Sequence, residues 1–156
     1  MIDNETRLER LTELQGMLTH HDQLFTKKKV RFDIRNWAKL DYFDSETECG
    51  TAACALGSAA LYEPFAKAGL CLSCGESGSP VCDSYEGYSA GAEFFGITAD
   101  ESLFLFSPGA YGDRGHDYPT APELNAIYGF MEPVRNVTPE HVAARVGKLI
   151  EKYKEK

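Results

Sequence analysis

The sequence has no run of about 18 apolar residues, the length that a membrane-spanning helix requires. Its first residues, MIDNETRLERLTEL, are charged and amphipathic and lack the apolar core of a signal peptide. Excess positive charge is also missing, because 24 acidic against 16 basic residues leave a net charge of −8. Phosphate backbones and anionic lipid surfaces repel such a chain. We therefore expect a cytoplasmic protein that binds neither nucleic acid nor membranes.

Nucleotide-binding signatures are absent as well, because the sequence contains no GxxxxGK[ST] and no GxGxxG that follows a strand. The five cysteines are an odd set, which argues against a complete disulfide framework and favours free thiols. No internal repeat and no long linker divides the chain. Its 156 residues therefore suit one domain with its own core, residues 1–156, and no cofactor other than the zinc considered below.

The spacing of apolar residues predicts a mainly α-helical, compact single domain with a short strand or hairpin, and an α+β domain is the alternative. Leucines at positions 8, 11, 14 and 18 predict an amphipathic helix over residues 4–25, capped by Asn4. A capping box from Thr98 to Glu101 and another from Thr120 to Glu123 each open a helix. Thr138-Pro139 opens the last helix. Its apolar face consists of Val142, Val146, Leu149, Ile150 and Tyr153.

Two segments favour extended structure. Val30, Phe32 and Ile34 alternate with polar residues and predict a short strand, although a helical turn capped by Asp33 remains the alternative. Residues 69–90 are rich in Gly, Ser and Cys and predict a loop or a loose hairpin. Residues 107–119 are polar and rich in glycine, and a connection of that length is a candidate functional loop.

The stretch ECGTAACALGSAAL, residues 48–61, admits a catalytic interpretation. At a helix N-terminus the positive end of the dipole would favour the Cys49 thiolate. His116 would be the general base, and Asp113 or Asp117 would orient it. A hydrolase or transferase that depends on Cys49, His116 and Asp117 is therefore one hypothesis.

Packing explains more of the same stretch. A capping box from Ser45 to Glu48 predicts a helix that starts at Ser45, leaves Cys49 inside its first turns and ends near Leu61. Acidic neighbours at positions 44, 46 and 48 would raise the pKa of the Cys49 thiol. The many Gly and Ala residues favour the close approach of another helix, above all at Gly57, because a glycine inside a helix costs about 1 kcal/mol relative to alanine.

A second candidate site is a metal site in the loop that contains Cys71, Cys74 and Cys82. A Cys-x-x-Cys turn followed by glycine places two thiolates together, as in half of a zinc knuckle. Structural zinc takes four ligands, so His116, Cys49 or Cys54 would supply the fourth. The alternative is a reduced surface loop whose thiols have no role.

Several motifs together resemble a group of small phage and prophage proteins without an established activity. They are Phe32-Asp33-Ile34 with Trp37, Cys49-Gly50-Thr51 with Cys54 and Gly57, Phe94-Phe95-Gly96-Ile97 and Leu105-Phe106. The group is similar in its CGTxxCxxG core, and the resemblance covers about residues 30–130 without the Cys71–Cys82 loop. It implies a phage-encoded accessory protein in the bacterial cytosol rather than a reaction. We expect it to bind a host protein, for example as an inhibitor of a defence or regulatory factor. A zinc-stabilised interaction module is a further alternative.

Overall fold

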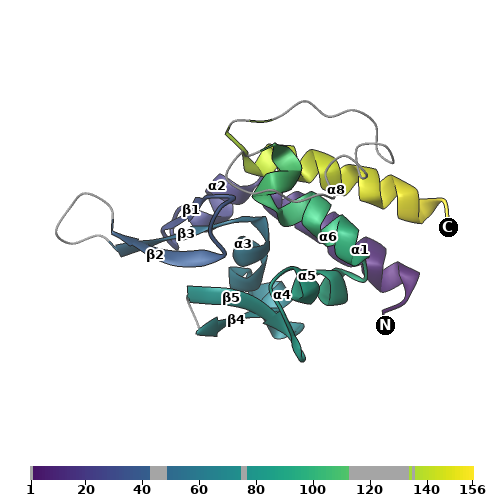
Figure 1. The fold of residues 1–156 in the computed structure, drawn as a ribbon, viewed down its shortest axis with the longest axis horizontal. Helices are drawn as coiled ribbons and strands as arrows, with labels where there is room; N and C mark the ends of the chain where they lie inside the picture. The colour runs from purple at the N-terminus through teal and green to yellow at the C-terminus, as the bar shows by residue number, and fades with distance from the viewer. Residues whose placement is uncertain (1, 43–48, 75–76, 113–133, 135) are drawn as a thin grey trace.

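The computed structural model describes residues 2–42, 49–74, 77–112, 134 and 136–156. Over these residues the fold is mainly α-helical and includes two small sheets of three strands each. Helices α1 (Asn4–Thr19) and α8 (Pro139–Lys154) lie side by side, and the two ends of the chain lie on the same side (Figure 1). Within the described ranges no helix combines the length and apolar character needed to cross a membrane.

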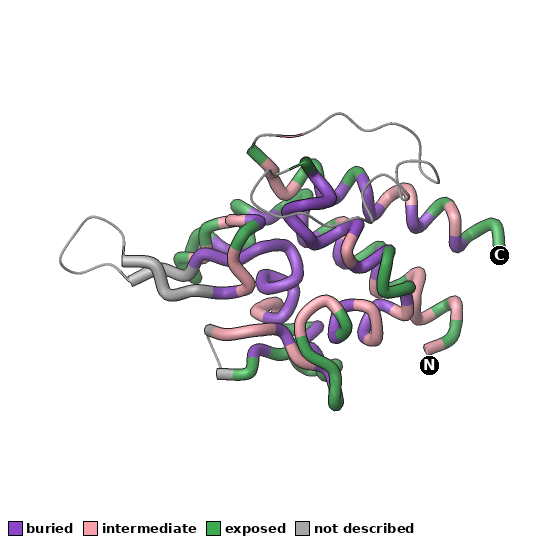
Figure 2. Tube along the Cα trace, in the orientation of Figure 1, coloured by how far each residue is buried: buried purple, intermediate pink, exposed green. Residues whose placement is uncertain are grey.

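The core lies between α1, α8 and the helices that they cover. The apolar faces predicted for the first and last helices are largely buried, and α1 and α8 contact each other. Buried and exposed residues alternate along α8 in Figure 2. Each fully buried Leu or Phe side chain stabilises the fold by about 1.5–3 kcal/mol relative to exposure. The buried residues of these two helices include Leu11, Leu14, Leu18, Val142, Val146, Leu149, Ile150 and Tyr153.

The helix predicted over residues 4–25 exists in two parts. Helix α1 is capped by Asp3 rather than Asn4, because the Asp3 carboxylate accepts a hydrogen bond from the backbone N–H of Thr6 at 2.7 Å. His20 ends α1, and the short helix α2 (His21–Phe25) follows directly. Helix α2 buries His21 and Phe25.

Strand β1 (Val30–Phe32) confirms the strand predicted near residue 30. It lies parallel to β3 (Cys49–Ala53), and β2 (Ala38–Tyr42) pairs antiparallel with β3 from the other side. Asp33 starts a turn, not a helix, since the backbone N–H of Asn36 donates to its carbonyl oxygen at 3.2 Å. The strand interpretation of this segment is therefore the right one.

The single helix predicted from Ser45 to Leu61 is wrong. Residues 49–53 form the central strand of the first sheet, and helix α3 (Ala55–Leu61) begins only after Cys54. Strands on both sides satisfy the backbone hydrogen bonds of β3, and this long-range pairing overrides the local capping signal at Ser45. The helix does end at Leu61, as predicted, and α4 (Glu63–Lys67) follows with a proline in its first turn.

Helix α3 contacts strands of both sheets. The second sheet consists of β4 (Cys71–Cys74), β5 (Ser77–Cys82) and β6 (Tyr85–Glu86) in antiparallel order, which confirms the hairpin predicted over residues 69–90. Gly57 is covered by the backbone of Trp37, which precedes β2, and not by the second helix that the sequence led us to expect.

Helices α5 (Tyr88–Phe95) and α6 (Ala99–Phe106) and the 3-10 turn η1 (Pro108–Tyr111) complete the described fold. The predicted capping box of α6 is confirmed on both sides, by Thr98 and by Glu101. Phe104 and Phe106 of this helix are buried, whereas Leu103 is only half-buried. The helix predicted from Thr120 and most of the loop at residues 107–119 lie outside the described residues.

Buried Arg145 ties α8 to this part of the fold. Its Nη1 donates to the carbonyl oxygen of Phe104 at 2.7 Å, and its guanidinium lies 3.6 Å from the ring centroid of Tyr111. Burial lowers the pKa of Arg145 and raises the pKa of Tyr111. A cation on α8's apolar face is thus compensated by a carbonyl dipole and aromatic faces.

Candidate functional site

A surface pocket of about 640 Å³ lies where the start of α1, the α5–α6 connection and the end of α8 meet. This volume is within the range of about 300–1,000 Å³ that ligand pockets usually have. Its lining includes Ile2, Arg7, Tyr85, Glu93, Tyr153 and Lys156. The residues come from both ends of the chain and from its middle, so only the folded protein forms this pocket.

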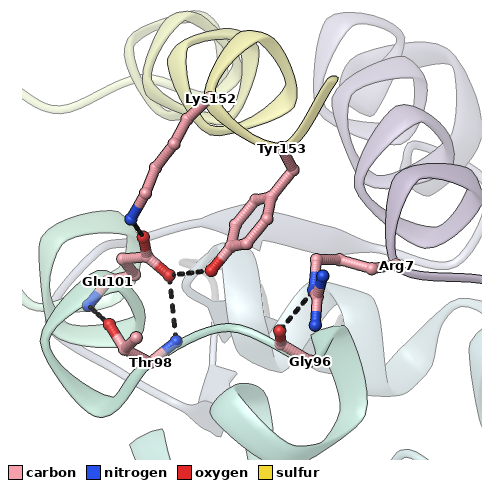
Figure 3. Close-up of polar contacts among 6 residues, drawn as sticks. All are labelled: Arg7, Gly96, Thr98, Glu101, Lys152 and Tyr153. Carbon is pink, nitrogen blue, oxygen red and sulfur yellow. Dashed lines mark hydrogen bonds and ion pairs between the residues drawn. The ribbon is translucent and has the colours of Figure 1, made fainter. Parts of the chain in front are cut away.

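The side chain of Glu101 organises one wall of the pocket (Figure 3). It is 2% exposed, and its Oε2 accepts hydrogen bonds from the backbone N–H of Thr98 at 2.9 Å and from the Tyr153 hydroxyl at 2.5 Å. The ammonium group of Lys152 forms an ion pair with the other carboxylate oxygen. The capping carboxylate of α6 therefore also anchors α8.

The hydroxyl of Tyr153 has a structural role. Burial raises the pKa of Tyr153, and the hydrogen bond to the Glu101 carboxylate raises it further. A phenol that is held neutral and already donates to a carboxylate is a poor acid or base near neutral pH. Tyr153 instead presents the face of its ring to the pocket residues Arg7 and Lys156.

Arg7 is held in place by three contacts. Its Nε donates to the carbonyl oxygen of Gly96 at 2.6 Å, and its Nη1 donates to the side-chain oxygen of Asn4 at 2.7 Å. The guanidinium lies 4.5 Å from the ring centroid of Tyr153. Figure 3 shows Arg7 reaching from α1 toward Gly96. These contacts fix the orientation of a cation at the edge of the pocket.

Gly96 is required at this position for two reasons. Its φ of +65° lies in the left-handed region that favours glycine, where it ends α5. A Cβ at this position would lie 2.5 Å from Cγ1 of Ile2. The Phe-Phe-Gly-Ile motif therefore lets the N-terminal segment pack against the end of α5 and close the pocket.

The described residues that line the pocket include neither cysteine nor histidine. Their polar groups are two cations, one carboxylate, hydroxyls and backbone, beside the apolar side chains of Ile2 and Ile97. Such a mixture of charged, hydroxyl and apolar groups suits the binding of an amphipathic group.

The catalytic hypothesis placed Cys49 at a helix N-terminus, and this placement is wrong. Cys49 lies in strand β3, where it is paired with Tyr42. The side chain of Cys49 and all of Asp113, His116 and Asp117 lie outside what the structure describes, so their mutual distances stay untested. Because Cys49 is not at a helix N-terminus, the positive end of a helix dipole does not favour its thiolate.

The cysteine at the helix start is Cys54 instead. It is the N-cap of α3, and its sulfur accepts a hydrogen bond from the backbone N–H of Gly57 at 3.4 Å. The residue is 1% exposed, and burial raises the pKa of its thiol to about 11. A buried, protonated thiol in this position caps a helix and is not a nucleophile.

Two thiols of the proposed zinc loop lie on adjacent strands. Cys71 of β4 pairs with Val81 of β5, so Cys82 is offset by one residue from the cross-strand partner of Cys71. Cys71 is exposed, whereas Cys82 is buried, and burial raises the pKa of its thiol. No group of three Cys, His, Asp or Glu in the described ranges could hold a metal. The side chain of Cys74 falls outside those ranges, and the zinc site stays a prediction.

The two adjacent histidines differ sharply. His20 is exposed, whereas His21 is 3% exposed and packs against the rings of Phe25 and Phe32. Its Nε2 lies 3.0 Å from the hydroxyl of Ser58, which is fully buried. The contact between His21 and Ser58 connects α2 to α3. Because both side chains are buried, a substrate cannot reach them, and the pair is not a catalytic dyad.

Sequence reasoning missed the pocket residues, although one signal was present. Arg7 precedes Leu11, Leu14 and Leu18 by four, seven and eleven positions, so it lies on the buried face of the first helix. A charged residue on an apolar face requires a partner that the helix itself does not provide. Nothing local points to Gly96 or Tyr153 as that partner.

Comparisons with protein-family models, curated proteins and solved structures find no match to this chain.

Proposed function

We propose that this chain is a phage-type accessory protein that acts in the cytosol of a bacterial host by binding a host protein. The observation that carries the proposal is the pocket between α1, α5 and α8, with Tyr85 at its edge. Tyr85 is 46% exposed, and tyrosine is enriched among the residues that dominate protein interfaces. The phage-like motif supports a phage origin. The net charge of −8 is compatible with a soluble binding protein.

The structural roles of the described residues in the phage-like motif support binding over catalysis. Cys54 caps α3, Gly57 lies under the backbone of Trp37, and the Asp33 carboxylate accepts from the side chain of Asn36 at 2.9 Å. These motif residues build the connection between the first sheet and α3. Residues that serve the fold in this way leave the binding surface to other parts of the chain.

Site-specific photo-crosslinking tests the proposal. Benzoylphenylalanine is placed at position 85 or, as a control, at position 24, because Tyr85 and Leu24 are both large, exposed side chains with 46% and 41% exposure. In bacterial cells, we expect a defined crosslinked protein from position 85 alone. Ser89→Trp, which fills the pocket from an exposed position, should abolish this product. Equal products from both positions, or a product that Ser89→Trp leaves unchanged, would contradict the proposal.

A second variant addresses the catalytic alternative in the same cells. Cys49→Ala should leave both the crosslinked product and the biological effect of the protein unchanged if binding is the activity. Loss of that effect, with folding and crosslinking intact, would favour the enzyme that depends on Cys49 and His116.

A further inference from the structure

We infer that the pocket binds a carboxylate of a peptide and that Arg7 is the residue that recognises it. This inference rests on the proposed function, because it names the chemistry of the group that the partner would insert. Arginine recognises carboxylates through a planar fork of N–H donors, which lysine does not possess.

The hydrogen bonds of Arg7 leave part of this fork available. A guanidinium carries five N–H donors, and Arg7 uses one at Nε and one at Nη1 for Gly96 and Asn4, which leaves three. Both partners are neutral oxygen atoms, and no carboxylate within the described ranges forms an ion pair with Arg7. Because Arg7 lines the pocket, an entering carboxylate reaches a guanidinium that forms no ion pair with a carboxylate of the described residues.

The position of Arg7 is fixed before any ligand binds. The ring of Tyr153 supports the guanidinium, and Tyr153 is itself held by the buried carboxylate of Glu101 (Figure 3). The carbonyl oxygen of Gly96 also holds the guanidinium, by accepting a hydrogen bond from Nε. A donor group that is already ordered loses little side-chain entropy on binding, which favours affinity.

The other charges around the pocket favour a ligand with a single negative charge. Lys156 adds a second cation, with its Nζ 5.1 Å from the ring centroid of Tyr153, whereas Glu93 adds a carboxylate to the same lining. Asp3 also interacts electrostatically with Arg7, although its side chain caps α1. Because these acids offset part of the positive charge of Arg7 and Lys156, a ligand with one negative charge matches the pocket better than a dianionic phosphate.

The apolar lining indicates that the carboxylate arrives on a peptide with an apolar side chain. Ile2, Ile97 and Ala92 line the pocket together with Arg7. A peptide side-chain carboxylate and a C-terminal carboxylate share this chemistry. The protein's net charge of −8 gives no long-range attraction for either, so recognition depends on the local contact with Arg7.

The inference is tested with acetylated tripeptides and an NMR titration of the Arg7 Nε–H resonance. The probes are leucine-glutamate-leucine amide, leucine-glutamine-leucine with a free carboxylate, the neutral leucine-glutamine-leucine amide and inorganic phosphate. We expect saturable shifts with at least one carboxylate peptide, and the arm that saturates identifies the source of the carboxylate. Equal binding of the neutral amide, stronger binding of phosphate, or no saturable shift with either carboxylate peptide would overturn the inference.

Arg10 provides a matched control on the same helix. Its Nη1 donates to the carbonyl oxygen of Phe94, and its guanidinium stacks on the aromatic ring of the same residue. Arg10 does not line the pocket. Arg7→Gln and Arg7→Lys should each weaken peptide binding by about tenfold or more, as expected for loss of a charge-assisted hydrogen bond, whereas Arg10→Gln should not. Equal weakening by Arg10→Gln would contradict a specific role for Arg7.

The two proposals fail in different ways. If the product crosslinked from position 85 persists in Arg7→Gln, the carboxylate assignment is wrong and partner binding through the pocket still stands. If carboxylate peptides bind but no pocket-dependent product forms in cells, the carboxylate site stands and the host-protein function fails.

Discussion

The carbonyl oxygen of Trp37 lies so close to Gly57 that a Cβ atom on Gly57 would be 1.4 Å from it. The two residues join the turn before β2 to the first turn of α3, next to the Cys54 cap. Contact between backbones at this distance tolerates only glycine. The structure therefore gives Gly57 of the CGTxxCxxG stretch a physical reason, which is close packing of α3 against the segment that leads into the first sheet.

Gly57→Ala should destabilise the protein by about 3 kcal/mol or more, the upper part of the usual range for overpacked sites, because backbone atoms must move. Gly16→Ala is the matched control within α1, since a Cβ there meets nothing within 4 Å. It should stabilise the helix by about 0.5–1 kcal/mol. Urea unfolding of the two variants measures both effects, and similar stabilities would refute the close contact at Gly57.

Glu101→Gln should lower the free energy of unfolding by about 1–3 kcal/mol. One amide oxygen cannot replace a carboxylate that accepts from Thr98, Tyr153 and Lys152. Asp100→Asn removes the same charge from the same helical turn at an exposed position, so it reports the helix-dipole contribution alone. That contribution is about 0.3–1 kcal/mol. Thermal or urea unfolding measures both variants. If Glu101→Gln and Asp100→Asn lower the free energy of unfolding by the same amount, the buried hydrogen bonds of Glu101 add nothing to stability.

The stability of the protein should decrease in mild acid because of His21. Burial lowers the pKa of His21 below its ordinary value of 6.5, although Asp22 and Glu140 partly oppose this effect. As the pH falls, His21 of the unfolded chain therefore takes up a proton before His21 of the folded protein does. The contribution of neutral His21 to the stability of the fold is complete above pH 6.5 and is lost as the pH falls through the lowered pKa. The slope from this one proton is at most about 1.4 kcal/mol per pH unit.

Urea unfolding between pH 7.5 and pH 5 measures this slope. His20→Gln should retain it, since His20 is exposed, whereas His21→Gln should reduce it. If both variants keep the slope of the unmodified protein, other groups cause the acid sensitivity.

The cysteines should differ in their reaction with iodoacetamide at pH 8. Cys54 is buried with its pKa raised to about 11, whereas Cys71 is exposed. Peptide mass spectrometry should find Cys71 alkylated and Cys54 unmodified in the folded protein, and both alkylated in urea. Labelling of Cys54 at the rate of Cys71 in the folded protein would contradict its role as a helix cap.

Much of the helical structure was predictable because its signals are local. The capping box links Thr98 to Glu101 across three residues, and the buried face of α8 repeats every three or four residues from Val142 to Tyr153. The strand at Val30–Phe32 followed from alternation. Strand β3 was missed because Gly and Ala have weak strand preference and its partners, β1 and β2, lie elsewhere in the sequence.

The candidate site was not predictable in the same way. The cysteines attracted attention because their spacing suggests chemistry, yet Cys54 is a buried cap and Cys49 lies in a strand. The pocket residues carry no spacing signal, because Arg7 and Tyr153 are at opposite ends of the chain. Only the position of Arg7 on an apolar helical face marked it beforehand.

The sequence by itself determined the fold class, the capped helices, the acidic charge and the small-residue stretch, since each depends on composition or on residues within a few positions. Tertiary structure alone decided that Cys49–Ala53 is a strand, that Trp37 covers Gly57, and that Arg7, Gly96 and Tyr153 meet at one pocket. Contacts of this kind join segments that are distant along the chain, so their free energy depends on the packing of whole helices and sheets.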